Sequence, residues 1–209
     1  MEKKRGCVAN AKKLCKSCRT RKDNSMTSAR LEQLYRKTIK ASLQKELALD
    51  NVMSVPEIKK IVINIGVKEA VADSRVLQRI AKVIGEIAGQ SPVITKAKKS
   101  IAGFKIREGM PLGVMVTLRR KRMYEFLDRL INIALPNVRD FRGVSPKLDR
   151  RGNYNLGIKE WSVFREAETV SNEKVYGVNI TIHTSAKNDA HAYALLKSFN
   201  MPFRSSKDK

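Results

Sequence analysis

Acidic side chains are scarce in this sequence. Its 209 residues carry 20 aspartates and glutamates against 43 lysines and arginines, which gives a formal net charge of +23. Such an excess of one sign costs self-repulsion, and a polyanionic partner is the usual reason for it. Nucleic acid and an anionic membrane are the two candidates. At 42% hydrophobic residues, the chain is not a wholly disordered protein.

Long apolar runs are missing. The longest, such as IVINIGV (61–67), are far too short to span a bilayer, and the N-terminus has no apolar core of a secretory signal. A membrane-surface protein would need an amphipathic helix free to bind lipid. The segment 31–47 comes nearest, but its apolar face is needed for the core. We therefore expect a soluble protein that stays in the compartment where it is made, with no membrane partner.

Cysteine occurs only near the N-terminus, at Cys7, Cys15 and Cys18. An odd number of clustered cysteines does not indicate a disulfide framework. Cys15 and Cys18 have the spacing of a zinc knuckle, but no fourth ligand lies nearby, because His183 and His191 are distant. Two interpretations stay open: reduced cysteines without a cofactor, which we favour, and a Zn²⁺ site completed by a distant or intermolecular ligand.

Signatures of catalysis are absent as well. The sequence contains no G-x-x-x-x-G-K-[ST], G-x-S-x-G or H-E-x-x-H motif. Asp128 and Asp140 lie beside arginines, which favours surface ion pairs over acid–base chemistry. We predict that the protein is not an enzyme.

The hydrophobic pattern divides the chain into a basic extension, residues 1–27, and one domain, residues 28–206, with an N-terminal part (28–110) and a C-terminal part (111–206). The extension has too few large apolar residues for a core and is expected to be flexible. Helical spacing predicts helices at 31–47, 73–88, 123–135 and 188–198, the second capped by Asp73 or Ser74 and stopped by Gly89. Alternation predicts strands at 55–67, 92–97, 113–119, 157–164 and 176–184. The order indicates an α+β sandwich, RRM-like in general architecture, with helices on one face of a mainly antiparallel sheet.

Residues 94–113, ITKAKKSIAGFKIREGMPLG, form a dense cationic loop between two predicted strands. Lysines supply charge, glycines let the backbone approach a phosphate, and Phe104 is able to stack on a base or sugar. Binding to an RNA backbone explains these features together. The alternative is a solvated hairpin tip without a partner, since tips are exposed in any protein.

A second candidate surface is the face of the sheet that the helices leave open. Asn64 interrupts an apolar strand, Gln90 and Thr95 flank the next strand, and Arg119 ends the third. Polar residues on one face suit a platform for RNA, although such residues are also ordinary on an exposed sheet. The loop 137–157 is longer than most connections, and loops of that length are commonly functional or disordered.

Several long segments resemble one family closely. They are IVINIGVKEAVAD, GQSPVITKAKKSIAGFKIREGMPLG, VTLRRKRMYEFLDRLINIALPNVRDFRG, GNYNLGIKE and the terminal FNMPF. The sequence is similar to the bacterial-type 5S-rRNA-binding ribosomal protein family of the large subunit, fifth in the usual numbering, from about residue 28 to 204. The resemblance implies an α+β fold and a structural role in the central protuberance, where 5S rRNA is held against 23S rRNA. It also implies a cytoplasmic ribosome, with an organellar one left open.

The resemblance further implies roles for particular residues. The sheet face would bind 5S rRNA through Asn64, Gln90, Thr95 and Arg119. The hairpin tip would reach P-site tRNA or RNA phosphates through Lys96, Lys98, Lys99, Ser100, Phe104 and Lys105. The long loop would form an intersubunit bridge with a protein of the small-subunit head, through Arg139, Arg142, Lys147, Arg150, Arg151 and Tyr154.

Two segments depart from the family pattern. Residues 1–27 have no counterpart in it. The stretch WSVFREAETVSNEKVYG (161–177) replaces a commoner phenylalanine–proline–glutamate pattern and has Arg165 at the place of the proline.

Overall fold

A single sheet forms the centre of the structure, a computed structural model that describes residues 28–71, 73–168 and 174–204. It has five strands in the order β2-β3-β1-β5-β4, and every neighbouring pair is antiparallel. The strands are β1 (Ile58–Gly66), β2 (Val93–Lys96), β3 (Pro111–Leu118), β4 (Tyr154–Ile158) and β5 (Val178–Thr184).

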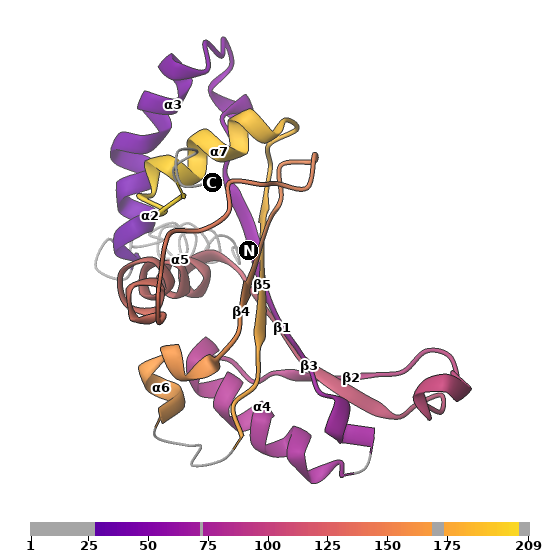
Figure 1. The fold of residues 1–209 in the computed structure, drawn as a ribbon. Coiled ribbons are helices and arrows are strands. Elements are labelled where there is room, and N and C mark those ends of the chain that lie inside the picture. The colour runs from indigo at the N-terminus through magenta and orange to yellow at the C-terminus, as the bar shows by residue number, and fades with distance from the viewer. Residues whose placement is uncertain (1–27, 72, 169–173, 205–209) are drawn as a thin grey trace, which may run out of the picture.

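The helices gather on one side of this sheet (Figure 1). They are α2 (Arg30–Leu34), α3 (Lys40–Glu46), α4 (Arg75–Ala88), α5 (Arg120–Arg129), α6 (Arg165–Glu168) and α7 (Asp189–Ser198). A π-helical turn, Tyr35–Ile39, joins α2 to α3 without a break, and a second one, Leu130–Ala134, extends α5. Within the described ranges no helix covers the other side of the sheet. The expected α+β class, with helices on one face, is confirmed.

Alternation along the strands explains why only one face is buried. In β1, Ile61, Ile63 and Ile65 are at most 1% exposed, whereas the residues between them point to the other side, because successive strand residues face opposite ways. These isoleucines lie opposite Leu118, Val116 and Val114 of β3. Full burial of such a side chain contributes roughly 1.5–3 kcal/mol. The helix-covered face therefore stabilises the fold and leaves the other face free for contacts.

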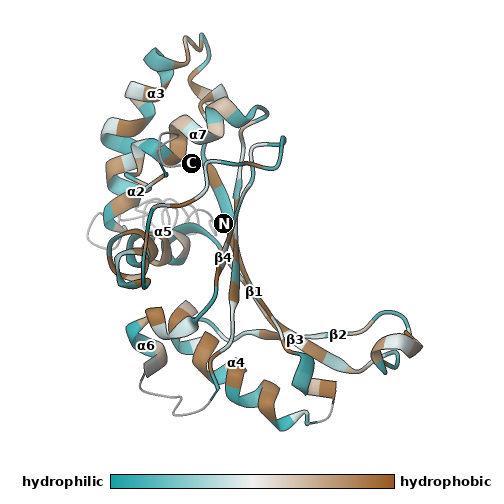
Figure 2. Cartoon of the chain, in the orientation of Figure 1, coloured by the Kyte–Doolittle hydropathy of each residue, from teal (hydrophilic) through white to brown (hydrophobic). Residues whose placement is uncertain are grey.

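Helix α4 illustrates how the sequence sets the helix layer. Its buried residues recur at helical spacing, and Figure 2 shows hydrophobic and hydrophilic residues alternating around it. The carboxylate of Asp73 accepts a hydrogen bond of 2.9 Å from the backbone N–H of Arg75, and Gly89 ends the helix with a φ of 64°. Only glycine adopts that conformation at little cost. The predicted start and stop of this helix are confirmed.

The strand predicted at 157–164 is misplaced. The structure has it earlier, at Tyr154–Ile158, and Trp161–Val163 form a 3₁₀ turn instead. The reason lies in the core: Trp161 and Phe164 are 2% and 3% exposed, and the Phe164 ring stacks on Phe126 at 6.0 Å. Burying these two rings against the helix layer takes the chain away from the sheet.

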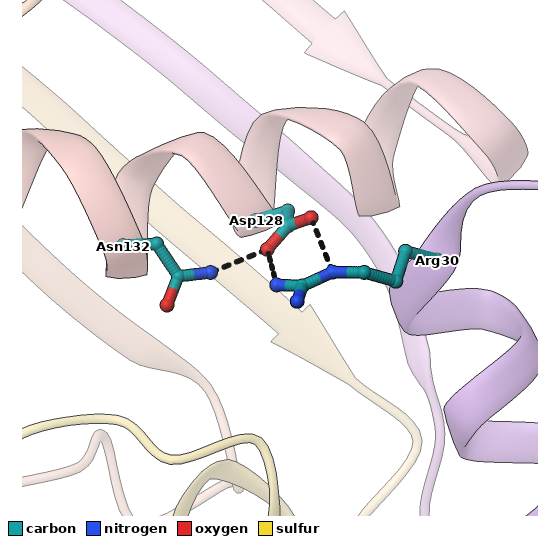
Figure 3. Close-up of polar contacts among 3 residues, drawn as sticks. All are labelled: Arg30, Asp128 and Asn132. Atoms are coloured by element: carbon teal, nitrogen blue, oxygen red, sulfur yellow. Dashed lines mark hydrogen bonds and ion pairs between the residues drawn. The ribbon is translucent and has the colours of Figure 1, made fainter.

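A network of charged hydrogen bonds connects α2 to α5 (Figure 3). Arg30 donates through Nη2 and Nε to the two carboxylate oxygens of Asp128, at 2.5 and 3.1 Å, and Asn132 donates to the same carboxylate. The expected surface ion pairing of Asp128 is confirmed, but its partner is Arg30 and not the neighbouring Arg129, which pairs with Glu166. Because Arg30 is largely exposed, solvent screens the pair, and it contributes little to stability. Most of the stabilisation comes from burial of α2 and α3, including the Tyr35 ring stacked on Phe199.

Candidate nucleic-acid interface

The uncovered face of the sheet carries polar and small residues from all five strands. The register places Asn64 between Met115 of β3 and Asn179 of β5, and Gly66 opposite Gly113 of β3. In the next row, on the side of Asn64 away from Gly66, Val62 lies opposite Thr117 of β3 and Thr181 of β5. The rows through Gly66, Asn64 and Val62 are therefore uncharged, and the face offers amides, hydroxyls and backbone groups to a partner.

Two of the four predicted sheet residues lie within strands of this face. Asn64 is exposed in the middle strand, and Thr95 is half-buried in β2, opposite Gly113. Gln90 lies before β2, where its side-chain amide is 3.5 Å from the carbonyl oxygen of Thr117. Arg119 is exposed directly after β3, and its extended backbone continues the alternation of Met115 and Thr117. The structure brings these residues to one half of the open face, around β2, β3 and β1.

The other half of the face was missed by sequence reasoning. Asn179, Thr181 and His183 of β5 alternate with the buried Val178, Ile180 and Ile182, so they point to the open side. The same alternation was visible in the sequence VNITIHT and would have identified them. Together with Asn155 of β4, opposite Thr181, they extend the polar surface to the far edge of the sheet.

Within the described ranges, His183 is the one group on the open face whose pKa departs from its ordinary value. It lies opposite Lys60 of β1. Burial lowers the pKa of its imidazole below the usual value, the nearby Lys60 ammonium lowers it further, and the Asp149 carboxylate partly offsets both. His183 is therefore mostly neutral at pH 7 and is able to donate and accept hydrogen bonds there.

The hairpin β2–β3 extends away from the sheet and ends in an exposed tip (Figure 1). No residue from 96 to 110 is buried, and the Phe104 side chain is 71% exposed. Local hydrogen bonds hold the tip: the backbones of Ile101 and Ile106 bond to each other in both directions, at 3.0 and 3.1 Å. The expected hairpin is confirmed, and Phe104 is not a core residue.

The cations of the tip have no acidic partner among the described residues. They are Lys96, Lys98, Lys99, Lys105 and Arg107, and all are exposed. Ser100 differs from them, because its hydroxyl oxygen accepts a hydrogen bond of 3.1 Å from the backbone N–H of Glu108. The lysines and Phe104 are thus available for an external partner, while Ser100 also shapes the turn.

The long loop before β4 is held in a defined conformation. The carboxylate of Asp189, at the start of α7, accepts hydrogen bonds from the backbone N–H groups of Arg150 and Gly152, at 3.0 and 2.9 Å. The backbone of Val144 bonds to Pro202 and Arg204 near the C-terminus, at 2.8 Å each. Five of the predicted loop residues are exposed: Arg139, Arg142, Lys147, Arg150 and Arg151.

Tyr154 is different from these five. It is 1% exposed, its hydroxyl donates to the carbonyl of Ser145 at 2.7 Å, and its ring meets Phe203 edge-on at 5.8 Å. Burial raises the pKa of its phenol to about 12. The structure therefore places Tyr154 in the core, where it supports the loop and offers no ring surface to another molecule.

Two other kinds of site are absent from the described ranges. No helix there is long and apolar enough to span a bilayer. Those ranges also hold no cluster of three or more histidine, cysteine, aspartate or glutamate side chains suited to a metal ion. Cys7, Cys15 and Cys18 lie outside the described residues.

Comparison with known proteins matches this chain to one family. Residues 51–107 match the family described as ribosomal protein L5, and residues 111–203 match the model of that ribosomal family's C-terminus. The large ribosomal subunit protein uL5 of Geobacter sulfurreducens is 58% identical over 177 residues, 84% of this chain and 99% of the relative. That of Nitrosococcus oceani is 55% identical over 177 residues, 84% of this chain and 98% of the relative. That of Acidobacterium capsulatum is 56% identical over 178 residues, 85% of this chain and 98% of the relative.

Proposed function

Because the chain belongs to the ribosomal L5 family, we propose that it binds 5S rRNA through the open sheet face and helps to attach that RNA to 23S rRNA. The membership itself makes the chain a component of the large ribosomal subunit, with an RNA-binding, structural and non-enzymatic role on the cytoplasmic ribosome. The finer assignments below are proposals.

The uncovered sheet face is the observation that carries the 5S rRNA proposal. It presents Asn64 and Thr95 beside Met115, with Gln90 and Arg119 at its border. Amide and hydroxyl groups read base edges and ribose hydroxyls, and a flat sheet accommodates unstacked nucleotides. Its rigidity, which the buried opposite face supplies, favours selective binding over purely electrostatic attraction.

We assign the hairpin tip to P-site tRNA. Its exposed lysines supply sequence-independent attraction to phosphates, and the exposed Phe104 ring is free to stack on a nucleotide. Because the tip stands away from the sheet (Figure 1), both surfaces are able to bind at the same time.

We assign the loop from Arg139 to Arg151 to an intersubunit bridge with a protein of the small-subunit head. The support is its exposed arginines and lysine, together with the Asp189 hydrogen bonds that fix the loop's shape. A fixed basic loop suits an acidic protein surface, since electrostatic complementarity favours specific encounter. Tyr154 is left out of this surface because it is buried.

A competition experiment tests the central proposal. The purified full chain is bound to labelled 5S rRNA transcript, and unlabelled 5S rRNA, an elongator tRNA or anionic vesicles are added as competitors. We expect only 5S rRNA to displace the label efficiently. Equal displacement by tRNA would contradict selective binding through the sheet, and displacement by vesicles would favour the membrane alternative.

A further inference from the structure

Two glycines in the described ranges combine open space at the side-chain position with a φ that is not positive. A side chain at Gly66 or Gly103 would find no atom within 4 Å, and neither residue has the positive φ that favours glycine. Glycine destabilises a strand or turn relative to alanine unless its freedom is used. Folding alone would therefore favour a larger residue at both positions.

The neighbouring glycine of the sheet gives the contrasting case. A Cβ at Gly113 would lie 2.6 Å from the carbonyl oxygen of Ile65 and 3.0 Å from the Thr95 hydroxyl. The fold therefore excludes any side chain at Gly113. Gly66 lies directly opposite Gly113 in the register, but a Cβ atom at Gly66 would point into open space.

Both of these glycines lie on surfaces that are candidates for RNA binding. Gly103 is in the exposed turn Ala102–Phe104 at the hairpin tip. Gly66 ends β1 on the open face, two residues after Asn64. Glycine inside a strand often marks close approach of a ligand or another backbone. An open position for a side chain, on a surface proposed for RNA, is consistent with an external cause for the glycine at residue 66.

The surroundings of Gly66 indicate which part of an RNA would approach it. The row through Gly66 continues to Gly113 and Thr95, and the adjacent row contains Asn64 and Met115. None of these side chains is charged. A phosphate would need cations or aligned N–H groups, whereas a base or ribose packs on bare backbone and bonds to an amide or hydroxyl at its edge.

We propose that Gly66 is a specificity-determining residue of the RNA interface, where a base or ribose of the bound RNA packs directly against the backbone of β1 beside Asn64 and Thr95. The proposal rests on the proposed function of the sheet face. It adds that the absence of a side chain at residue 66 is required by the RNA and not by the fold.

The test is a series of substitutions in the full chain, probed with a 5S rRNA transcript. Gly66→Ala is expected to leave the unfolding temperature unchanged or higher, and to weaken RNA binding by roughly tenfold, as loss of a close interface contact does. Gly66→Val is expected to weaken binding further. The slope of affinity against salt stays constant in both, because no phosphate contact is removed.

Two control variants sharpen the result. Gly85→Ala places the same methyl group in α4, within the helix layer, where it makes only ordinary contacts with Pro92 at 3.6 Å and the Gln90 carbonyl oxygen at 3.9 Å. Its RNA binding is expected to stay within about twofold of the original, a change below RT in free energy. Gly113→Ala is expected to lower the unfolding temperature, because its methyl group clashes with the Ile65 carbonyl.

Three outcomes overturn the proposal. In the first, Gly66→Ala binds 5S rRNA as tightly as the original chain. In the second, Gly66→Ala and Gly85→Ala lose the same affinity, so that the loss does not depend on the open face. In the third, Gly66→Ala lowers the unfolding temperature as Gly113→Ala does, so that the fold requires the glycine. Failure of the original chain to select 5S rRNA would instead refute the proposed function.

Discussion

The open sheet face and the hairpin tip differ in how their shape is maintained. The sheet face lies on a layer of side chains such as Ile61, Ile63 and Leu118, each at most 1% exposed. The tip has no buried residue from 96 to 110 and depends on local hydrogen bonds. The first surface therefore has a shape fixed by the core of the protein, while the second has a shape fixed only by its own turn.

The two surfaces also differ in charge. The rows through Asn64 and Gly66 are uncharged, whereas the tip carries exposed cations without an acidic partner among the described residues. Neutral groups in fixed positions discriminate between RNA structures, and exposed charges add affinity that salt weakens. Under the proposed function, the sheet supplies selectivity for an RNA and the tip supplies electrostatic attraction. Substitutions in the two elements are therefore expected to alter these properties separately.

The largest effect is expected from the sheet. Combining Asn64→Ala with Arg119→Ala should weaken 5S rRNA binding by a few kcal/mol, since a hydrogen bond to a charged group contributes roughly 1.5–3 kcal/mol. Filter binding with 5S rRNA measures the loss, and circular dichroism checks the fold. Because both residues are exposed, the unfolding temperature should hardly change. Unchanged affinity in a folded variant would contradict the role of the sheet.

Sequence reasoning identified the open face because the strand period is strict. Alternation of Ile61, Ile63 and Ile65 fixes the side of Asn64, and the same rule places Asn179 and Thr181 of β5. The cationic hairpin was equally accessible, since its charges and glycines are close together in the chain. Both features follow from residues that are close together in the chain, so a single sequence is sufficient to predict them.

Other features depend on contacts between distant segments and were not predictable. The loop before β4 takes its shape from the Asp189 carboxylate, which lies 39 residues from Arg150 in the sequence. Strand β4 ends early because Trp161 and Phe164 pack into the core. Tyr154 looked like a surface residue of a basic loop, but it is the first residue of β4 and is buried.

The next effect concerns the ring at the tip. Phe104→Ala should weaken tRNA binding by at most about 1–3 kcal/mol, the contribution of one aromatic ring stacked on a base. Its unfolding free energy should not change, since the ring is 71% exposed. Phe126→Ala is the matched control: Phe126 is 1% exposed, and removing it should cost about 3–5 kcal/mol of stability. Equal stability losses in the two variants would show that Phe104 is structural.

A smaller effect is expected from the lysines of the tip. Lys98→Ala with Lys99→Ala should reduce the log–log slope of tRNA affinity against salt by about 1.4–1.8, which is two contacts at roughly 0.7–0.9 each. Incorporation of the variant into large subunits should continue, because the proposed 5S rRNA surface is the sheet and not the tip. Loss of the variant from purified large subunits, with normal tRNA binding on the remaining particles, would make the tip an assembly anchor instead.

The smallest effect tests whether one further positive charge on the open sheet face strengthens RNA binding. The pKa of His183 is below its ordinary value of 6.5, through burial and Lys60, so its imidazole is neutral at pH 7. Acidification below that pKa adds one positive charge beside the proposed RNA. Bound phosphates would raise the His183 pKa, so that RNA binding takes up a proton and affinity rises as pH falls.

Binding of 5S rRNA measured from pH 7.5 down to about pH 5.5 should therefore strengthen for the original chain by less than about tenfold, the scale of one added charge near RNA. In His183→Gln this rise should be absent, and affinity at pH 7.5 should match the original, because the imidazole is uncharged there. The chain contains one other histidine, His191 in α7 on the helix side, and His191→Gln should keep the rise. If His183→Gln also keeps it, the proton is taken up elsewhere, and the β5 half of the open face does not lie against RNA.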